Sequence, residues 1–585
     1  MPIANVLKRV VKPFVPVSVR NRLRALPSRG QRIPAPELTD FPDWAGWIRQ
    51  DKRLWDAARQ SADGPTVLLA TSMGGFTPAT IVESLLGVCL TLRGARVRFL
   101  VCDKLLPACL QTHVLPPDPG VLERYELKTV LCDGCYSQGS AFYATHGLPV
   151  SRYAEFVSQQ ERAEARRRAN VVPYDEIPSY RPHGLAVGEH AVAGALRFYA
   201  RGHLAGADRA EITLRRFLEA SLLAVTAMRN LLAREQVERA CFHHGIYVPQ
   251  GLIAETCRQA GVPIVTWNVA YREGCFLFSH DDTYHHTMLT EPLEAWEEMA
   301  WGPAQERELM DYLASRLTGT RDWLWFHEKP VEDIGQIARE LGLDLDKPTI
   351  GLLTNVFWDA QLHYRANAFE DMLDWVLQTI RYFARRPELQ LLIRIHPAEV
   401  RGTIPSRQPL LAEIRRALPE LPPNVFIIPP ESDSSTYAAM DACDSVLIYG
   451  TKTGVELSSR GIPVIVAGEA WVRDKGITRD ASSPEEYFRI LDGLPLGRRL
   501  DGATMRRARM YAYHFFFRRM IPLPFMQVAH DKAVPFTVEI DGLRDLLPGK
   551  HRGLDVICDG ILTGAPFVYP AERFAAERTE LEAAL

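Results

Sequence analysis

The sequence contains no run of eighteen apolar residues, and its start lacks the apolar core and small-residue cleavage site of a secretory signal. These absences exclude a membrane-spanning helix of ordinary length and a typical secreted protein, so we expect a cytoplasmic protein. Hydrophobic residues make up 47% and charged residues 24% of the chain, as in globular rather than disordered proteins. With 585 residues the chain is too long for a single hydrophobic core, so two large domains are expected.

The net charge is only −3, which gives no reason to expect binding to nucleic acid. The charge is uneven, however, because residues 1–36 carry Lys and Arg side chains and no acidic ones. Apolar residues such as Val10, Phe14 and Leu23 are interleaved with these cations, as in basic amphipathic segments on anionic membrane surfaces. Since prolines interrupt any helix there, the alternatives are contact with the inner face of the cell membrane and a disordered basic tail.

Ten cysteines in a cytoplasmic chain favour reduced core residues over disulfides. One group comprises Cys102, Cys109, Cys132 and Cys135; it includes a C-x-x-C step and could supply four thiolates to a structural zinc ion. The alternative is four buried thiols, because six residues separate the first pair where zinc sites usually have two to four.

The first domain begins with a predicted βαβ unit. Residues 66–71 form a short apolar run, a glycine turn at Gly74 and Gly75 follows, and a helix over 77–93 leads to a strand at 97–101. We favour a structural role for the glycines over phosphate binding, because any tight strand-to-helix turn requires glycine. Residues 151–236 are rich in Arg, Glu and Ala and predict a helical insertion.

The strand and helix alternation then resumes and continues into a second domain. In the first domain we expect strands at 239–243, 262–267 and 286–290 and a helix at 248–260. In the second we expect strands at 349–354, 389–395, 425–428, 445–448 and 463–466, with helices near 366–386, 408–418, 435–443, 454–460 and 484–492. The pattern predicts two doubly wound parallel sheets, whose ligands bind beyond the carboxyl ends of the strands.

Arg394 and His396 stand at the carboxyl end of a buried strand, and Pro397 blocks its extension. A guanidinium and an imidazole at this edge could bind a phosphate and stabilise negative charge on a departing nucleotide. A core or capping histidine is the alternative for His396 taken alone.

Two further strand ends carry groups that suit an anion. Ser434 and Ser435 open a helix, although a serine N-cap is the routine explanation. The next strand ends in Tyr449-Gly-Thr-Lys-Thr-Gly454, in which Thr451, Lys452, Thr453 and Gly454 lead into a helix bearing Glu456. Lys452 supplies charge, Gly454 allows close approach of a ligand, and Glu456 could accept hydrogen bonds from a ribose diol.

These motifs resemble the carboxyl-terminal half of bacterial capsule polysaccharide biosynthesis proteins, over roughly residues 345–475. The resemblance rests on Arg394-Ile-His-Pro397, Tyr449-Gly-Thr-Lys-Thr-Gly-Val-Glu456 and Arg460-Gly-Ile-Pro-Val-Ile-Val-Ala-Gly468. It implies the two-domain GT-B glycosyltransferase fold, some of whose members transfer Kdo from a CMP-sugar. It also implies that His396 and Pro397 and the pair Ser434 and Ser435 contact the donor phosphate and that Glu456 holds the ribose. Related chains often have Asn-Ser-Thr or Ser-Ser where this one has Thr-Lys-Thr.

His244 and Asp359 are the candidate general bases for an acceptor hydroxyl, because each follows a strand that ends at the expected cleft. His396 is the third catalytic candidate. A structural role is the alternative for His243, His244 and Asp359. We expect no metal requirement, because Arg394, Lys452 and helix N-termini can supply positive charge, and no Asp-x-Asp motif of the metal-dependent kind is recognised.

The prediction is therefore an α/β protein with two doubly wound Rossmann-like domains facing a cleft. The expected divisions are a basic arm and linker at 1–60, an acceptor domain at 61–330, a nucleotide-sugar domain at 331–498 and a crossover helix and tail at 499–585. The expected reaction moves a sugar from a CMP- or UDP-sugar to a glycan or lipid-linked acceptor, without a tightly bound cofactor. A nucleotide-sugar 2-epimerase and a non-catalytic glycan-assembly scaffold are the alternatives.

Overall fold

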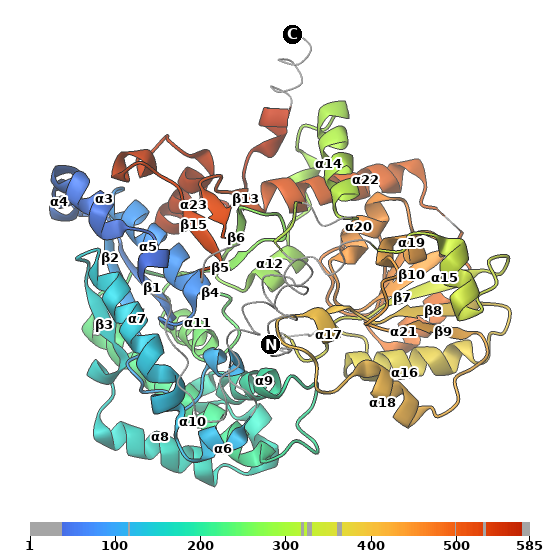
Figure 1. Ribbon diagram of the computed structural model, residues 1–585, viewed down its shortest axis with the longest axis horizontal. Helices are drawn as coiled ribbons and strands as arrows, with labels where there is room; N and C mark the ends of the chain where they lie inside the picture. The colour runs from blue at the N-terminus through green and yellow to red at the C-terminus, as the bar shows by residue number, and fades with distance from the viewer. Residues whose placement is uncertain are drawn as a thin grey trace, which may run out of the picture.

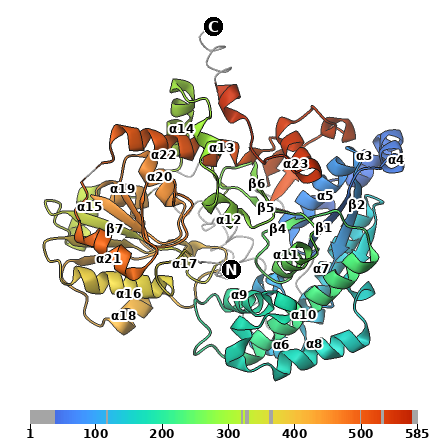
Figure 2. The ribbon, with the colours of Figure 1, turned by 180° about the vertical axis from the view of Figure 1, so that it is seen from behind.

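The computed structural model describes residues 38–114, 118–317, 321–323, 330–359, 366–497, 499–529 and 534–575. Two lobes lie side by side, each built around its own sheet (Figure 1), and the reverse view shows the same division (Figure 2). The arm at 1–36, with its predicted membrane contact, lies outside the described residues. Within them, no helix combines the length and apolarity needed to cross a bilayer.

The first sheet has seven strands in the order β13-β6-β5-β4-β1-β2-β3. Strands β1 to β5 pair in parallel, whereas β6 runs antiparallel to β5 and β13 antiparallel to β6. The strands are β1 (Thr66–Ser72), β2 (Arg96–Val101), β3 (Val150–Arg152), β4 (Arg239–His243), β5 (Ile264–Val269), β6 (Cys275–His280) and β13 (Ile521–Pro522). The strand order reverses between β1 and β4, which is where a doubly wound sheet binds its ligand.

The second sheet is parallel throughout, in the order β12-β11-β10-β7-β8-β9. Its strands are β7 (Thr349–Leu353), β8 (Gln390–Arg394), β9 (Val425–Ile428), β10 (Ser445–Ile448), β11 (Val464–Val466) and β12 (Arg479–Asp480). Here the order reverses between β7 and β10. The predicted α/β class with two doubly wound domains is confirmed.

Helices cover both faces of the two sheets (Figure 1). In the first lobe they are α3 (Trp44–Gln50), α4 (Lys52–Gln60), α5 (Thr77–Thr91), α6 (Pro119–Glu123), α7 (Asp133–Ala144), α8 (Gln159–Val171), α9 (Val187–Tyr199), α10 (Ala210–Arg234), α11 (Gln250–Gln259), α12 (Tyr284–Leu289), α13 (Glu294–Glu297) and α14 (Pro303–Ser315). In the second they are α15 (Ile334–Leu341), α16 (Met372–Phe383), α17 (Ala398–Arg401), α18 (Leu410–Ala417), α19 (Thr436–Asp441), α20 (Thr453–Ser459) and α21 (Pro484–Asp492). The predicted helical insertion corresponds to α8, α9 and α10.

The strand predicted at 286–290 is wrong, because these residues lie in and just after α12. Thr283 caps this helix: its side chain accepts a hydrogen bond from the backbone N–H of His286 at 3.2 Å. A side-chain acceptor at the N-cap satisfies an otherwise unpaired helix donor and so favours a helix start at this point. The missing strand is β6, earlier in the chain.

The chain returns to the first lobe after the second sheet is complete. Helix α22 (Gly502–Tyr513) packs on α20 and on α14, and β13 then joins the first sheet beside β6. The two-stranded sheet of β14 (Met526–Val528) and β15 (Phe536–Val538) follows, and α23 (Arg552–Thr563) packs against α5. Figure 1 shows these red segments above the first lobe, with α22 bridging the two.

One apolar cluster joins the lobes around α22, and we call it the hinge-side core. It combines first-lobe residues with residues of the second sheet and of the returning segment. Its buried members include Leu277, Met288, Trp296, Leu309, Val446, Val472 and Phe515. Continuous apolar packing across two lobes fixes their relative placement on this side.

The glycine turn after β1 has the structural role expected of it. A Cβ atom on Gly74 would lie 2.5 Å from the Cα of Gly139 and 2.5 Å from the carbonyl oxygen of Cys135, so only glycine lets α7 approach so closely. The turn's polar groups are also occupied, since the Gly74 carbonyl accepts from Gln138 at 2.9 Å and the Gly75 N–H donates to Cys135 Sγ at 3.1 Å.

Gly74→Ala should therefore lower the free energy of unfolding by about 1–3 kcal/mol, the usual cost of overpacking. Urea unfolding followed by circular dichroism measures it. Gly502→Ala is the matched control, because a Cβ atom there meets nothing within 4 Å. Equal stability of the Gly74→Ala protein and the wild type would contradict the close approach.

Candidate functional site

Arg394, at the end of β8, holds a neighbouring loop in place. The side chain is 1% exposed. Its guanidinium donates to the carbonyl oxygens of Pro429 at 2.5 Å and Ser432 at 3.2 Å and to Thr436 Oγ1 at 3.3 Å. Burial, followed by repulsion from Arg401, lowers the pKa of Arg394 to about 10, which leaves it charged at neutral pH. Arg394 therefore shapes the loop that carries Ser434 and Ser435.

His396 follows two residues later, and both its backbone and its ring are oriented. Its backbone N–H donates to Thr354 Oγ1, at the end of β7, at 3.0 Å. Its Nδ1 accepts the Ala398 N–H at 3.0 Å, so the neutral ring carries its proton on Nε2. Beside it, Asn355 Nδ2 donates to the Gly450 carbonyl at 2.8 Å and links the ends of β7 and β10 across the point where the strand order reverses.

The hydroxyl residues predicted here lie at the starts of α19 and α20. Ser435 caps α19 by accepting the Ala438 N–H at 3.3 Å, and Ser434 Oγ accepts from Ser432 Oγ at 2.9 Å. Thr451 Oγ1 accepts the backbone N–H of Thr453 at 3.3 Å. Ser435 therefore has the routine capping role. The hydroxyl residues nevertheless lie together at the helix starts that follow β9 and β10, as the sequence predicts.

Gly454 serves packing. A Cβ atom there would meet Ile448 Cδ1 at 2.5 Å and Val472 Cγ1 at 3.0 Å, so glycine lets α20 lie directly on the sheet.

Glu456 is the centre of a buried charge cluster that includes a residue from the other lobe. Its side chain is 1% exposed. Lys452 Nζ lies 2.7 Å and Arg316 Nε 3.2 Å from its Oε1, and the Tyr437 hydroxyl donates to its Oε2. Burial alone would raise the pKa of Glu456, but Arg316 and Lys452 lower it to about 2.

Arg316 stands just after α14, at the end of the first lobe, and the sequence analysis missed it. Its Nη1 also lies 2.5 Å from Asp322 Oδ2 and donates to the Tyr312 hydroxyl at 2.9 Å. Nothing in the local sequence sets Arg316 apart, because its partner Glu456 lies far along the chain. Lys452 in turn lies 4.7 Å from the centre of the Tyr271 ring, another first-lobe residue.

Glu456→Gln should lower the free energy of unfolding by about 3–5 kcal/mol, because Arg316 and Lys452 then keep buried charges without a counter-charge. Denaturant unfolding tests this. Glu388→Gln is the control: Glu388 is paired with Arg386 at the surface, where an ion pair contributes about 0–1 kcal/mol. Similar losses in the two variants would contradict the assigned cluster.

His244 follows β4 in the first sheet and has a strained backbone, with a φ of 64°. Its ring contacts those of Tyr247 and Tyr284, with centroids 5.5 Å and 5.6 Å away. Burial, followed by the nearby charges of Arg197 and His285, lowers the pKa of His244 to about 3, so the imidazole is neutral at physiological pH. Its buried Nδ1 has no hydrogen-bond partner among the described residues. A neutral imidazole with such a nitrogen can accept a hydrogen bond from a hydroxyl group.

Asp359, the second candidate base, is a contact between the lobes. Its Oδ1 accepts from Arg197 Nη1 of α9 and from the Tyr247 hydroxyl, each at 2.5 Å. Beside it, the Arg407 N–H donates to the Ala200 carbonyl at 3.0 Å. The structure thus brings Asp359 close to the Tyr247 that packs on His244, but Arg197 and Tyr247 already use the oxygen that a base would need.

His286 makes a further contact between the lobes that no local sequence pattern indicates. Its Nδ1 lies 3.3 Å from Asp282 Oδ2 of its own lobe and its Nε2 3.4 Å from Glu469 Oε2, which follows β11. These two carboxylates raise the pKa of His286 to about 10. Neighbouring His285 differs: burial, followed by repulsion from His286, lowers its pKa to about 4.

His286→Gln should therefore change the pH dependence of stability. Because the pKa of His286 is raised on folding, its contribution is complete below its ordinary value of about 6.5 and is lost as pH rises towards 10. The difference in melting temperature between wild type and variant should be largest near pH 6 and shrink by pH 10. Exposed His183, replaced by Asn to suit its φ of 57°, is the control. A difference that is constant across this range would refute the ion pairs.

The four cysteines considered for zinc line one small cavity together with Met73, Lys104, Leu106, Gln111 and Leu131. Burial raises the pKa of each of the four thiols, and all are free. Among the described residues, no three His, Cys, Asp or Glu side chains are grouped so that they could hold a metal ion.

The chain does contain one Asp-x-Asp sequence, at Asp344 and Asp346, which corrects the expectation. It lies before β7, at the opposite end of this strand from Asn355 and Asp359.

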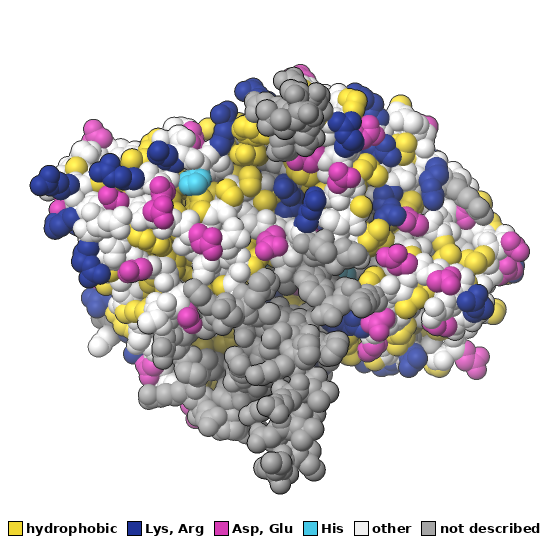
Figure 3. All heavy atoms as spheres, turned by 45° about the horizontal axis from the view of Figure 1, so that its top comes forward, with side chains coloured by type: hydrophobic (Ala, Val, Ile, Leu, Met, Phe, Trp, Pro, Cys, Tyr) yellow, Lys and Arg dark blue, Asp and Glu magenta, His cyan; other side chains and the backbone are white. Residues whose placement is uncertain are grey.

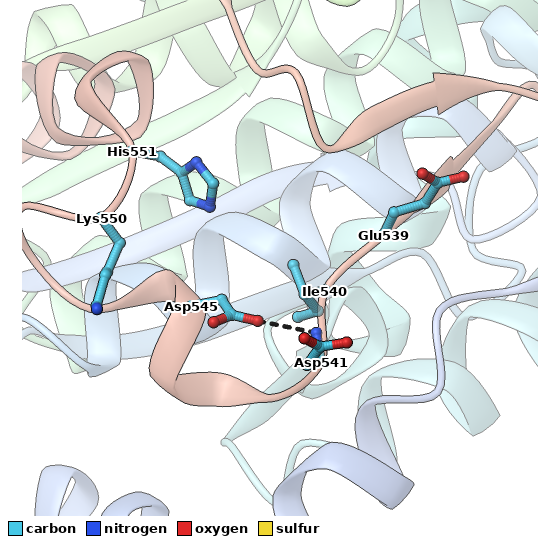
Figure 4. A pocket seen from close by; sticks show the side chains of 6 residues that line it. All are labelled: Glu539, Ile540, Asp541, Asp545, Lys550 and His551. Carbon is cyan, nitrogen blue, oxygen red and sulfur yellow. Dashed lines mark hydrogen bonds between the residues drawn. The ribbon is translucent and has the colours of Figure 1, made fainter.

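A separate hollow lies on the returning segment, away from both switch points. Figure 4 shows its lining of Glu539, Ile540, Asp541, Asp545, Lys550 and His551, with the Asp541 N–H donating to Asp545 at 2.8 Å. The segment packs on the N-terminal helices through Asp51, which accepts the Leu543 N–H at 3.0 Å. On the face in Figure 3, basic and acidic side chains are intermixed over both lobes, without one large patch of either sign.

No protein-family model matches the chain. No curated protein matches it either. Similar solved structures include the KpsC beta Kdo 2,4 transferase of Thermosulfurimonas dismutans, with 13% identity over 48% of this chain and 80% of the other and a TM-score of 0.32. A glycosyltransferase of Rickettsia africae has 10% identity over 86% and 100%, with a TM-score of 0.27. The UDP-GlcNAc 2-epimerase of Neisseria meningitidis has 11% identity over 76% and 96%, with a TM-score of 0.23. Because these scores are low, we base fold and function on the geometry of the chain itself.

Proposed function

We propose that the protein is a glycosyltransferase that moves a sugar from a nucleotide-sugar donor to an acceptor of a surface glycan. The observation that carries the proposal is a contact between the two sheets at their carboxyl edges: Tyr247, whose ring packs on His244 after β4, donates to Asp359 after β7. The second sheet offers a hydroxyl- and imidazole-rich edge, and the first sheet presents a neutral histidine to it. A donor site facing a proton acceptor is the minimum that transfer to a hydroxyl needs.

On the donor side, His396 donates from Nε2 to the phosphate, with Pro397, Ser434 and Ser435 beside it. Thr451, Lys452 and Thr453 carry further donors at the start of α20. Lys452 is held by Glu456, and burial, followed by repulsion from Arg316, lowers its pKa. Glu456 reaches the ribose by exchanging the Tyr437 hydroxyl for the ribose hydroxyls, since both donate to the same carboxylate.

On the acceptor side, His244 takes the proton of the attacking hydroxyl. It is the better base of the two candidates, because its Nδ1 has no partner among the described residues whereas Asp359 accepts from Arg197 and Tyr247. Asp359 instead keeps the lobes together. Positive charge from Lys452, Arg316 and Arg394 offsets the charge on the departing nucleotide.

A thermal-shift panel of CMP-, UDP- and GDP-sugars tests the donor site. A ligand that binds only the folded protein stabilises it by about 2.7 kcal/mol at 100 times its Kd, so one nucleotide class should raise the melting temperature. His396→Ala should abolish most of this shift, while His551→Ala, in the hollow of Figure 4, should retain it. A panel without any shift, or a full shift in His396→Ala, would contradict the proposal.

Incubation of the stabilising donor with and without glycan acceptors separates the related functions. Nucleotide release that depends on an acceptor is the expected outcome. A donor isomerised in the absence of acceptor would identify a 2-epimerase instead. Glycan production unchanged by His396→Ala and His244→Gln would identify a scaffold without catalysis.

A further inference from the structure

A buried carboxylate that the proposed reaction does not use lies beneath the first switch point. Glu83, in the second turn of α5, is 1% exposed. Its carboxylate accepts hydrogen bonds from the Thr71 backbone N–H at 3.2 Å, from the Thr71 hydroxyl and from Trp267 Nε1 at 3.4 Å. Within the described residues Glu83 makes no ion pair, so these neutral groups are what hold it.

Through these partners Glu83 joins the ends of three parallel strands. Thr71 is near the end of β1, and Trp267 belongs to β5. The Thr71 hydroxyl oxygen also accepts the backbone N–H of His243, the last residue of β4, at 2.8 Å. Thr71, His243 and Trp267 are followed in the chain by Ser72, His244 and Asn268, respectively. One carboxylate is thus linked to the residues that precede three positions at the carboxyl edge of the sheet.

Two of those residues have strained backbones. Ser72 has a φ of 68° and His244 a φ of 64°, a region that non-glycine residues seldom adopt. Such conformations persist only where surrounding contacts hold them. Glu83 contacts Thr71, the residue before Ser72, and the Thr71 hydroxyl contacts the backbone N–H of His243, the residue before His244. The His244 N–H itself donates to the Trp267 carbonyl at 2.9 Å.

We propose that Glu83 is the positioning residue for His244, acting through the Thr71 hydroxyl and the backbone of His243. The role rests on the proposed function, in which His244 accepts the proton of the acceptor hydroxyl. Glu83 itself does not touch a substrate. It holds the ends of β1 and β4 through its hydrogen bonds with Thr71, so that the His244 ring stays in contact with Tyr247 and Tyr284.

The surroundings also make this carboxylate a pH-sensitive element. Burial raises the pKa of Glu83 to about 8, against the opposing hydrogen bonds from Thr71 and Trp267. The titratable groups that face it are Tyr143 of α7 and Cys241 of β4, and burial raises the pKa of both, so they stay neutral. Folded protein therefore binds more protons than unfolded protein between about pH 4.5 and 8, and stability falls as pH rises through this window.

The test uses the full chain without a donor, with histidines labelled for NMR and the His244 signal assigned from its loss in His244→Gln. Glu83→Gln keeps an acceptor oxygen, so His244 should titrate as in the wild type, near pH 3. The melting temperature of the wild type should fall between pH 4.5 and 8, and that of Glu83→Gln should not show this fall. Glu83→Leu removes the acceptor, so the His244 midpoint should rise by at least one pH unit towards its ordinary value.

Glu219→Leu is the matched control, because Glu219 of α10 is another buried carboxylate of the first lobe. Its Oε2 accepts a hydrogen bond from the Tyr125 hydroxyl at 2.7 Å. It should lower the melting temperature and leave the His244 midpoint unchanged. Thr71→Val removes the hydroxyl that donates to Glu83 and accepts from the His243 N–H, so it should move His244 as Glu83→Leu does. It keeps the test decisive if Glu83→Leu does not fold.

An unchanged His244 midpoint in Glu83→Leu or in Thr71→Val would overturn the proposal, and so would an equal shift in Glu219→Leu. Failure of the proposed function is a separate result. It would appear as no response to any nucleotide sugar, while the coupling between Glu83 and His244, measured without donor, stays in place.

Discussion

The hinge-side core is the constraint on which the rest of the structure depends. It packs β6 and the helices before Arg316 against the second sheet and against the chain that returns through α22. Because interiors pack densely, the two sheets cannot slide along one another on this side. The polar contacts between the lobes follow from this placement, since each joins groups that neither sheet could bring together alone.

The interface that results is unusual in its balance of charge. Glu456 meets cations from both lobes, His286 meets carboxylates from both lobes, and Asp359 meets Arg197. Glu456 and Glu469 are buried, and buried charges are tolerated only when they are paired, so their pairings with the other lobe favour this relative orientation. Under the proposed function, a donor phosphate would compete here with partners already in place, and its binding would exchange ion pairs.

The fold followed from the sequence where local patterns were strong. Strands β7 to β11 of the second sheet were predicted within a residue, because they are short apolar runs bounded by Pro, Gly or charged residues. The edge strand β12 was not predicted, because its two residues are both charged. The first sheet was harder at its edge. Strand β6 depends on pairing with β5 and with β13, which comes from the far end of the chain, and α12 depends on a single cap at Thr283.

The candidate site likewise contains residues that local patterns predict and residues that only the tertiary structure brings together. His396, Ser435, Lys452 and Glu456 could be proposed because parallel strands bring their carboxyl ends to one edge. Arg316, Arg197 and His286 could not, because helices and lobe ends supply them and only the tertiary arrangement gives them partners. Glu83 is a further case: a glutamate in an apolar helix carries no local signal of the three strand ends that it joins.

The chain passes between the lobes twice, before β7 and again through α22. Tyr312 and Val331, on either side of the first crossing, and α22 at the second all pack in or against the hinge-side core. Two crossings define a line, so any opening of the molecule is restricted to a rotation about that line. Contacts near the axis barely separate in such a rotation, whereas distant ones separate most. The Arg197–Asp359 contact, in the last turn of α9 and outside this core, would therefore separate more than the packing around α22.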